Sequence, residues 1–296
     1  MKKQLFFILF ITLTACNSSK EITQPHPSGN AACNKVFAFT PAPGQFINEN
    51  YTITSPAEAC AYAEQQLQAN GALSLGGWGG SIIVGFDHPI TNDGGYNIRI
   101  GGNAFGTSSE QGIVFVMTDT NGNGLPDDQW YELAGSESEA ATTLRNYAVT
   151  YFRPAAADDP IRWEDNQEQT GLIKRIATHT QNYFPAWITG ESYTLHGVCI
   201  APNVEQVNGL WVAKPYPSGY ADNFGSDRFT DDGNAGGNVS YNHFRISNAI
   251  TAEGVSIRLA QIDFVKVQTG VNFWAPVIGE ISTEVFSIED YNFIKQ

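Results

Sequence analysis

Residues Gly112–Thr118 read GIVFVMT and are apolar at five consecutive positions, from Ile113 to Met117. A strand that buries only one face alternates apolar and polar residues, whereas this run is apolar on both faces. Val and Phe favour extended backbone, because their side chains pack well on a pleated surface. We therefore expect these residues to form a central strand of a β-sandwich.

Nine other segments after residue 80 are similarly rich in Val, Ile, Phe and Tyr, and clusters of Gly, Asn, Asp and Pro separate them. They are residues 81–87, 96–101, 129–134, 146–152, 193–200, 209–213, 241–247, 256–268 and 280–287. Within 256–268 the alternation of Ile257 and Leu259 changes phase to Ile262 and Phe264, which predicts a bulge or a change of sheet. The pattern predicts one all-β domain over 35–296, an antiparallel sandwich of jelly-roll type.

One segment has a helical period instead. Ser55 suits the N-cap, Pro56 the first helical position, and Glu58 completes a capping box. The apolar stripe consists of Ala59, Tyr62, Ala63 and Leu67. We expect an amphipathic helix over residues 55–70.

The composition restricts the classes of partner. The chain has 296 residues with 16 Lys+Arg against 30 Asp+Glu, a formal net charge of −14, and no basic cluster. Proteins that bind nucleic acid neutralise phosphates with clustered basic side chains, so this class is excluded. The 42% of hydrophobic residues supply enough material for a large core.

The first residues, MKKQLFFILFITLTAC, combine a basic start, an apolar run and a small-residue exit. This is typical of a secretory signal, here residues 1–15, and is too short for a spanning helix. It resembles the bacterial lipoprotein signal, which implies that Cys16 becomes the acylated first residue. Removal of Lys2 and Lys3 with the signal changes the net charge from −14 to −16.

Residues 16–34 are polar, contain Pro25, Pro27 and Gly29, and predict a flexible tether between the lipid and the domain. Asn17 follows the cysteine, whereas an aspartate there would resemble an inner-membrane retention signal. We expect a lipid-anchored protein of the outer membrane, exposed at the cell surface. The periplasmic leaflet stays open, because the acidic run of many surface-exported lipoproteins is missing.

Apart from Cys16, the sequence contains three cysteines, so at least one of them cannot form a disulfide within the chain. Of Cys33, Cys60 and Cys199, the pair Cys33–Cys60 is the first candidate for a disulfide in this compartment. Cys199 lies in an apolar run and is expected to be a small core residue.

The segment 119–128, DTNGNGLPDD, has the spacing of a calcium-binding loop. Oxygen side chains fall at positions 1, 3, 5 and 9, glycine at 6 and a backbone carbonyl at 7. The expected ligands of a structural calcium ion are Asp119, Asn121, Asn123, Leu125, Asp127 and Asp128. Position 12 is Trp130 instead of glutamate, so Asp128 or Glu132 would supply the missing carboxylate. An Asn-Gly hairpin turn that binds nothing is the alternative.

Two other segments suggest a ligand site. Residues 153–187 form a long polar stretch with Trp163 and Trp187 near its ends, and residues 220–238 are acidic and rich in glycine. Displayed aromatics stack on planar ligands, and long loops often carry function. The candidate ligand-binding residues are Trp163, Trp187, Tyr220, Asp222 and Asn223. Solvated loops and buried indoles are the alternatives, and for Trp78, inside GGWGG, we favour the core.

Enzymatic motifs are scarce. The sequence has no G-x-S-x-G, H-E-x-x-H or phosphate-binding glycine loop. Glu280 and Glu284 fall on one face of a predicted strand, which permits a carboxylate pair but more commonly marks a solvated face. We therefore expect a protein without catalytic residues.

Five segments together resemble a family of bacterial lipoproteins called "cell surface protein" in Bacteroidetes, some of which carry a PKD domain. The segments are 74–90 (SLGGWGGSIIVGFDHPI), 102–105 (GNAF), 130–136 (WYELAGS), 262–267 (IDFVKV) and 279–284 (GEISTE). The resemblance implies a galactose-binding-like jelly roll, often with a structural calcium ion, and brings no catalytic residues.

Some relatives of that family accompany outer-membrane uptake systems, including systems for corrinoids. We expect a module that binds a glycan or a nutrient such as a corrinoid and passes it to a TonB-dependent transporter. The alternatives are an adhesive surface protein that binds another protein and, third, a glycan-active hydrolase.

Overall fold

The computed structural model describes residues 29–49, 51–229 and 239–295. The predicted signal segment and residues 16–28 of the tether, Cys16 included, lie outside the described residues, as do Asp231 and Asp232 of the second acidic segment. In the described part of the chain, all pairings between named strands are antiparallel. The predicted all-β class is confirmed.

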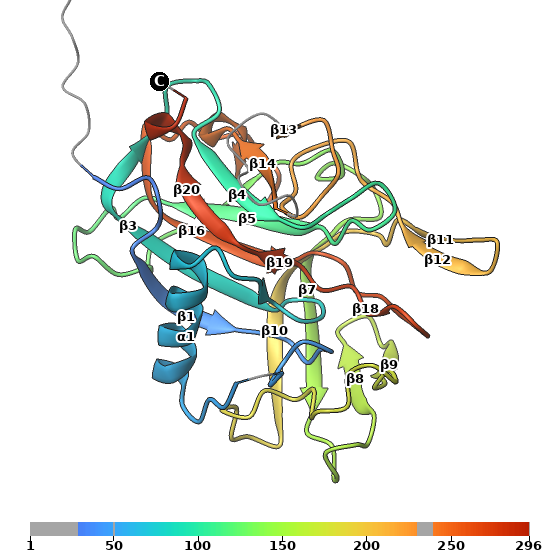
Figure 1. Cartoon of the computed structure of the whole chain (residues 1–296). Coiled ribbons are helices and arrows are strands. Elements are labelled where there is room, and N and C mark those ends of the chain that lie inside the picture. Colours follow the sequence, from blue (N-terminus) through green and yellow to red (C-terminus); the bar gives the residue numbers. More distant parts are fainter. Residues whose placement is uncertain (1–28, 50, 230–238, 296) are drawn as a thin grey trace, which may run out of the picture.

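The largest sheet has six strands in the order β1-β3-β16-β5-β6-β15 (Figure 1). Their bounds are β1 Lys35–Thr40, β3 Ser81–Thr91, β16 Gln261–Thr269, β5 Gly112–Met117, β6 Tyr131–Leu133 and β15 Ala249–Ile250. The expected central strand is confirmed, because β5 lies between β16 and β6 and buries Val114 and Val116 completely. The strand expected over 256–268 is shorter, because β16 begins at Gln261 and the phase change after Leu259 precedes it. The β16–β3 pairing shifts register between Ile262 and Phe264, where the extra residues lie on β3.

A second sheet has the order β13-β14-β4-β20, with bounds Arg228–Phe229, Ser240–Phe244, Ile98–Gly102 and Ser287–Asp290. Ile98, Ile100 and Ile288 from this sheet share one hydrophobic core with Val84 and Val265 of the first. Two sheets that bury their inner faces against each other form a sandwich. The jelly-roll connection of its strands stays a prediction.

A third sheet, β10-β7-β8-β9, comprises Ser192–Cys199, Leu144–Phe152, Ile161–Asp165 and Thr170–Ile173. It includes part of residues 153–187, so the expectation of one long polar loop there was wrong for 161–173. The strands β8 and β9 form a hairpin whose outward side chains, such as Arg162 and Glu164, are exposed. Exposed polar positions make an edge hairpin resemble a loop in sequence.

Trp78 lies in the second hydrophobic core, beneath this third sheet, as expected. Its indole nitrogen donates to the Val198 carbonyl at 3.2 Å, and it packs edge-on against Tyr147. The flanking glycines permit a tight turn: at Gly76 the φ angle is +69°, and a Cβ would lie 2.0 Å from the Ala42 carbonyl oxygen. GGWGG is therefore a buried turn.

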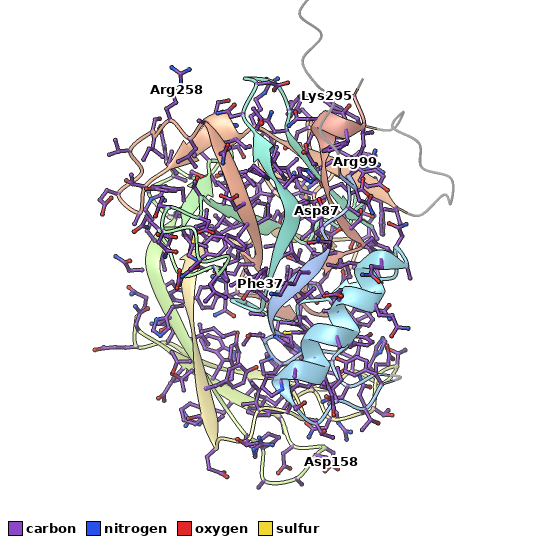
Figure 2. The ribbon with its side chains drawn as sticks, turned by 90° about the vertical axis from the view of Figure 1, so that its left-hand side faces the viewer. Phe37, Asp87, Arg99, Asp158, Arg258 and Lys295 are labelled. Atoms are coloured by element: carbon purple, nitrogen blue, oxygen red, sulfur yellow. The ribbon has the colours of Figure 1, made fainter. Side chains whose placement is uncertain are left out.

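The helix α1, Pro56–Gln68, packs beside β1, as Figure 2 shows. The Ser55 hydroxyl accepts from the Glu58 N–H at 3.3 Å, and the Glu58 carboxylate reaches back to the Thr54 N–H at 2.8 Å. Ala59, Ala63 and Leu67 are buried, which confirms the predicted stripe. No helix in the described residues combines the length and apolar character that crossing a bilayer requires.

Three short pairs complete the fold: β2 Leu73–Ser74 with β19 Glu284–Val285, β17 Trp274–Ala275 with β18 Gly279–Glu280, and β11 Val204–Val207 with β12 Leu210–Ala213. Two 3-10 turns, η1 Ile246–Asn248 and η2 Tyr291–Phe293, lie near the C-terminus. The single strand expected at 280–287 is therefore wrong, since β18, β19 and β20 divide it between three sheets. Cys33, Cys60 and Cys199 are all free thiols, and Cys199 is buried as predicted.

Candidate functional site

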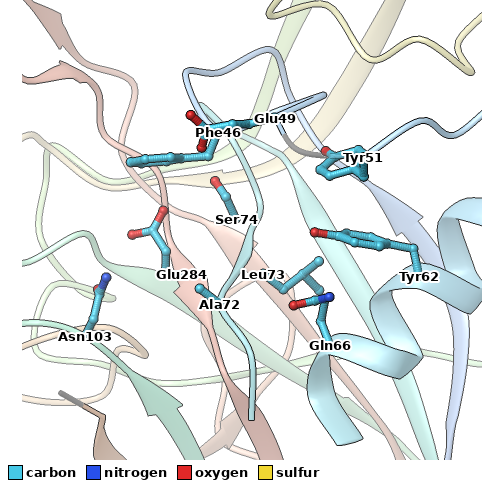
Figure 3. A pocket seen from close by; sticks show the side chains of 10 residues that line it. All are labelled: Phe46, Glu49, Tyr51, Tyr62, Gln66, Ala72, Leu73, Ser74, Asn103 and Glu284. Carbon is cyan, nitrogen blue, oxygen red and sulfur yellow. The ribbon is translucent and has the colours of Figure 1, made fainter. Parts of the chain in front are cut away.

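A cavity of about 460 Å³ opens between α1, β2 and the loop before α1. Figure 3 shows Tyr51 and Tyr62 on one side, Asn103 on the opposite side, and Ser74 and Glu284 between them. The full lining consists of Phe46, Glu49, Tyr51, Tyr62, Gln66, Ala72, Leu73, Ser74, Asn103 and Glu284. Aromatic faces thus meet carboxyl, amide and hydroxyl groups in one hollow.

Hydrogen bonds across the chain hold the loop that carries Phe46 and Glu49. The Asn48 side-chain amide donates to the carbonyls of Asn182 and Phe184 at 2.7 and 2.8 Å, and its oxygen accepts from the Ala186 N–H at 3.2 Å. Asn48 has a φ of +58°, which asparagine tolerates better than most residues. The loop therefore presents a defined wall.

The aromatic wall is supported from behind. The rings of Tyr51 and Tyr62 lie 4.4 Å apart, and Trp187, which is buried, packs 6.5 Å from Tyr51. Tyr62 projects from the half-buried side of α1 and keeps part of its ring open to the cavity. Desolvation by burial raises the pKa of Tyr62, so its hydroxyl stays protonated and available as a donor.

Three carboxyl groups from distant segments meet at the Glu284 end of the cavity. One carboxylate oxygen from each of Glu110, Asp222 and Glu284 lies within 4.8 Å of the other two. The Asp222 carboxylate accepts from the N–H groups of Asn103 and Glu284 at 2.9 and 3.0 Å, and Ser282 donates its hydroxyl to Glu284 at 3.2 Å. We call these three residues the carboxyl cluster.

The backbone is adapted to this arrangement. Asp222 has a φ of +49°, and a Cβ at Gly102 would lie 2.8 Å from its Oδ1 atom, so the missing side chain of Gly102 makes room for the carboxylate. Asp222 and Glu284 are buried, whereas Glu110 is half-buried. The cluster is a built part of the sandwich interior and extends to the cavity through Glu284.

Burial dominates the protonation of the cluster. Desolvation, with the nearby Glu110, raises the pKa of Asp222 to about 8, against the N–H donors that bind it. Desolvation, Glu110 and Asp222 raise the pKa of Glu284 well above its ordinary value. Burial also raises the pKa of Glu110, and a hydrogen bond from Glu284 opposes that rise. The cluster therefore retains protons at neutral pH, with Glu284 donating to Glu110.

Only one member of the carboxyl cluster faces the cavity. Glycoside hydrolases place two carboxyl groups about 5–9.5 Å apart on either side of the scissile bond. Here Glu284 lines the cavity, whereas Glu110 and Asp222 are not among its lining residues. Because the Glu284 proton is donated to Glu110, the Glu284 carboxyl group meets a ligand as an acceptor for a hydroxyl.

A second cavity, of about 280 Å³, contains Trp163, the one predicted ligand residue that lines either of these two hollows. Trp274, Asn272 and Glu280 line it as well. Glu280 is 2% exposed and Glu284 is 5% exposed, so the favoured interpretation of both as a solvated strand face was wrong.

The other predicted ligand residues serve the interior. Trp187 and Tyr220 are 4% and 1% exposed, and the Tyr220 hydroxyl accepts from the Glu137 N–H at 3.0 Å. Asn223 is fully buried, and its side chain makes two hydrogen bonds with the backbone of Tyr216. Its oxygen accepts from the Tyr216 N–H, and its amide nitrogen donates to the Tyr216 carbonyl. These aromatics are not displayed, because the strands around them close over the segment. Asp222 belongs to the carboxyl cluster.

The predicted calcium ligands lie together in an exposed loop. The Asp119 carboxylate accepts from the N–H groups of Gly122, Asn123 and Gly124, while the side-chain amides of Asn121 and Asn123 donate to Asp127. The Asp128 carboxylate binds Thr120. Oxygens of Asp119 and Asp127 thus turn toward the loop interior, as a hard cation requires, and calcium binding stays a prediction.

Sequence reasoning missed most of the first cavity. Phe46, Tyr51 and Gln66 carry no motif, and they lie far from Glu284 in the chain. No protein-family model matches this chain, and none of the curated proteins is similar to it in sequence.

Proposed function

We propose that this protein is a non-catalytic, lipid-anchored module that binds a hydroxyl-rich ligand, a glycan, in the cavity beside α1. The observation that carries the proposal is that the adjacent rings of Tyr51 and Tyr62 face the polar groups of Ser74, Asn103 and Glu284 across the cavity. Sugar rings present an apolar face that stacks on aromatics and an edge of hydroxyls that needs donors and acceptors. The volume lies within the range of about 300–1,000 Å³ typical of small-molecule sites.

A screen tests this proposal. The detergent-purified protein is applied to a glycan array and titrated with cobalamins, each with calcium and with a chelator. We expect saturable glycan binding that Tyr62→Ala weakens at least tenfold. Leu210→Ala, at a side chain that is 69% exposed on the β11–β12 hairpin, is the control and should bind normally. If the protein binds cobalamins but no glycan, the proposed ligand is a corrinoid instead. If it binds neither, the proposal is contradicted.

The cellular location of the protein is part of the same proposal. The sequence of residues 1–16 supports acylation of Cys16 and placement at the outer membrane, where a TonB-dependent transporter would receive the ligand. Metabolic labelling with a fatty-acid analogue should mark the wild-type protein and leave Cys16→Ser unmarked. Equal labelling of both proteins would contradict the anchor.

A glycan-active hydrolase is the second candidate, because a cluster of carboxyl groups reaches the cavity through Glu284. An oligosaccharide that binds the wild-type protein should be recovered intact after prolonged incubation. Cleavage that Glu284→Gln abolishes would favour the hydrolase over the binding module.

A further inference from the structure

The second cavity lies between the β8–β9 hairpin and the β17–β18 pair. Its ring-bearing wall comes from Trp78, Tyr151, Trp163, Phe273 and Trp274. Glu280, from β18, lines the same space, whereas Glu284, four residues later, lines the cavity beside α1. One short segment thus gives a buried carboxyl group to each cavity.

Only one of the two oxygens of the Glu280 carboxyl group has a hydrogen-bond partner among the described residues. Its Oε1 atom accepts from the Gln45 N–H at 2.6 Å, while its Oε2 atom is buried and has no hydrogen-bond partner among the described residues. A buried polar atom without a partner costs about 1–3 kcal/mol, and native proteins rarely leave one unexplained. A ligand group in the cavity would complete the set.

The tryptophans on the two sides of the cavity are held in place. The Trp163 ring lies over Gly171, its neighbour across the β8–β9 pair, where a Cβ would come within 2.4 Å of it. The Trp274 indole nitrogen donates to the Lys174 carbonyl at 3.1 Å. Aromatic side chains fixed in this way bind a ring at a small cost in entropy.

We propose that this cavity is a second ligand site, which takes a single neutral ring bearing hydroxyl groups, with Glu280 Oε2 as its hydrogen-bond partner. The inference rests on the proposed function for the chemical class of the ligand, but the cavity and its residues are different. The volume of about 280 Å³ matches one ring.

The charge of the Glu280 carboxyl group decides whether the second cavity favours a neutral ring or a cation. Aromatic walls with a carboxylate also bind quaternary ammonium groups. No basic side chain in the described residues forms an ion pair with Glu280. Desolvation by burial raises the pKa of Glu280 to about 8, and Glu110 contributes to the rise. An uncharged carboxyl group exchanges hydrogen bonds with a hydroxyl but attracts a cation weakly.

The test uses the full chain in the Tyr62→Ala background, which disables the first cavity. Neutral mono- and disaccharides, and separately tetramethylammonium, are titrated while tryptophan fluorescence is recorded. We expect saturable saccharide binding that Trp163→Ala weakens at least tenfold. Trp130→Ala, a half-buried tryptophan that lines neither cavity, is the matched control and should leave the affinity unchanged. Glu280→Gln, which is neutral and similar in shape, should change the affinity less than threefold at pH 7.

The possible failures are distinct. Saccharide binding that Trp163→Ala leaves unchanged, or that is missing in the Tyr62→Ala background while the wild-type protein binds, would overturn the second site and leave the proposed function intact. Saturable tetramethylammonium binding that Glu280→Gln abolishes would replace the neutral ring with a cation. A wild-type protein that binds no saccharide would overturn both proposals.

Discussion

The carboxyl cluster and the loop 119–128 contain the same chemical groups in opposite surroundings. In the loop, Asp119 and Asp127 come from one contiguous segment, and Asp127 is exposed. In the cluster, Glu110, Asp222 and Glu284 come from three distant segments, and the last two are buried. The loop follows a spacing that the sequence displays, whereas the cluster exists only because the sheets bring its members together.

The difference is one of energy. Asp119 accepts from three backbone N–H groups, but these lie in an exposed loop, so water can take the place of the carboxylate when it is removed. In the cluster, Asp222 is the acceptor for two backbone N–H groups, in a place where water contributes little. Buried polar groups cost more to disturb because their partners lose the only hydrogen bond available.

The largest expected effect comes from Asp222→Ala. It leaves the Asn103 and Glu284 N–H groups without an acceptor, and at about 1–3 kcal/mol each we expect a loss of about 2–6 kcal/mol in the free energy of unfolding. Asp119→Ala in the loop should cost about 1 kcal/mol or less. Urea denaturation compares the two, and Asp222→Asn, which keeps an acceptor oxygen, should restore most of the loss. Equal losses in the free energy of unfolding for Asp222→Ala and Asp119→Ala would contradict the difference between the carboxyl cluster and the loop.

Calcium is expected to give the next largest effect on stability. For this effect the loop 119–128 should matter and the carboxyl cluster should not. If the loop binds the ion, calcium at 100 times its dissociation constant stabilises the fold by about 2.7 kcal/mol. Thermal unfolding with calcium and with a chelator measures this shift. Asp119→Ala should abolish it and Glu284→Gln should not. The reverse pattern would assign the ion to the carboxyl cluster.

Per pH unit and per titrating group, the pH dependence of stability is a smaller effect. Because the folded pKa values of Asp222 and Glu280 are raised to about 8, the folded state holds protons that the unfolded chain releases near pH 4. Their stabilisation is complete below about pH 4 and declines as the pH rises to about 8. Each proton contributes at most about 1.4 kcal/mol per pH unit.

Denaturant titrations between pH 5 and 9 measure that slope. Asp222→Asn and Glu280→Gln should each flatten it, whereas Asp127→Asn in the exposed loop should leave it unchanged. A wild-type slope that neither Asp222→Asn nor Glu280→Gln alters would show that these two groups titrate normally.

Local patterns explain which parts of the fold were predictable. The strand at 112–117 and the helix at 56–68 each depend on neighbouring residues, and both were predicted. The β8–β9 hairpin was missed because its exposed charges interrupt the apolar pattern. The segment 279–290 was misjudged because acidic residues usually mark a solvated face, whereas here the strands that surround it bury it.

The candidate site was less predictable than the fold for the same reason. Its aromatic wall combines Tyr51 from the loop before α1 with Tyr62 from α1, and its polar side comes from β2, β19 and Asn103. Only Trp163, in the second cavity, was predicted as a ligand residue and lines a hollow. The other tryptophan candidate, Trp187, supports Tyr51 from the core.

The central claim is that the cavity beside α1 binds a hydroxyl-rich ligand. Calorimetric titration of the strongest array ligand into the wild-type protein, Tyr62→Ala and Leu210→Ala tests this claim most directly. The account predicts one affinity for the wild-type protein and Leu210→Ala, and an affinity at least tenfold weaker for Tyr62→Ala. Equal affinity in all three proteins would place the ligand elsewhere and contradict the claim.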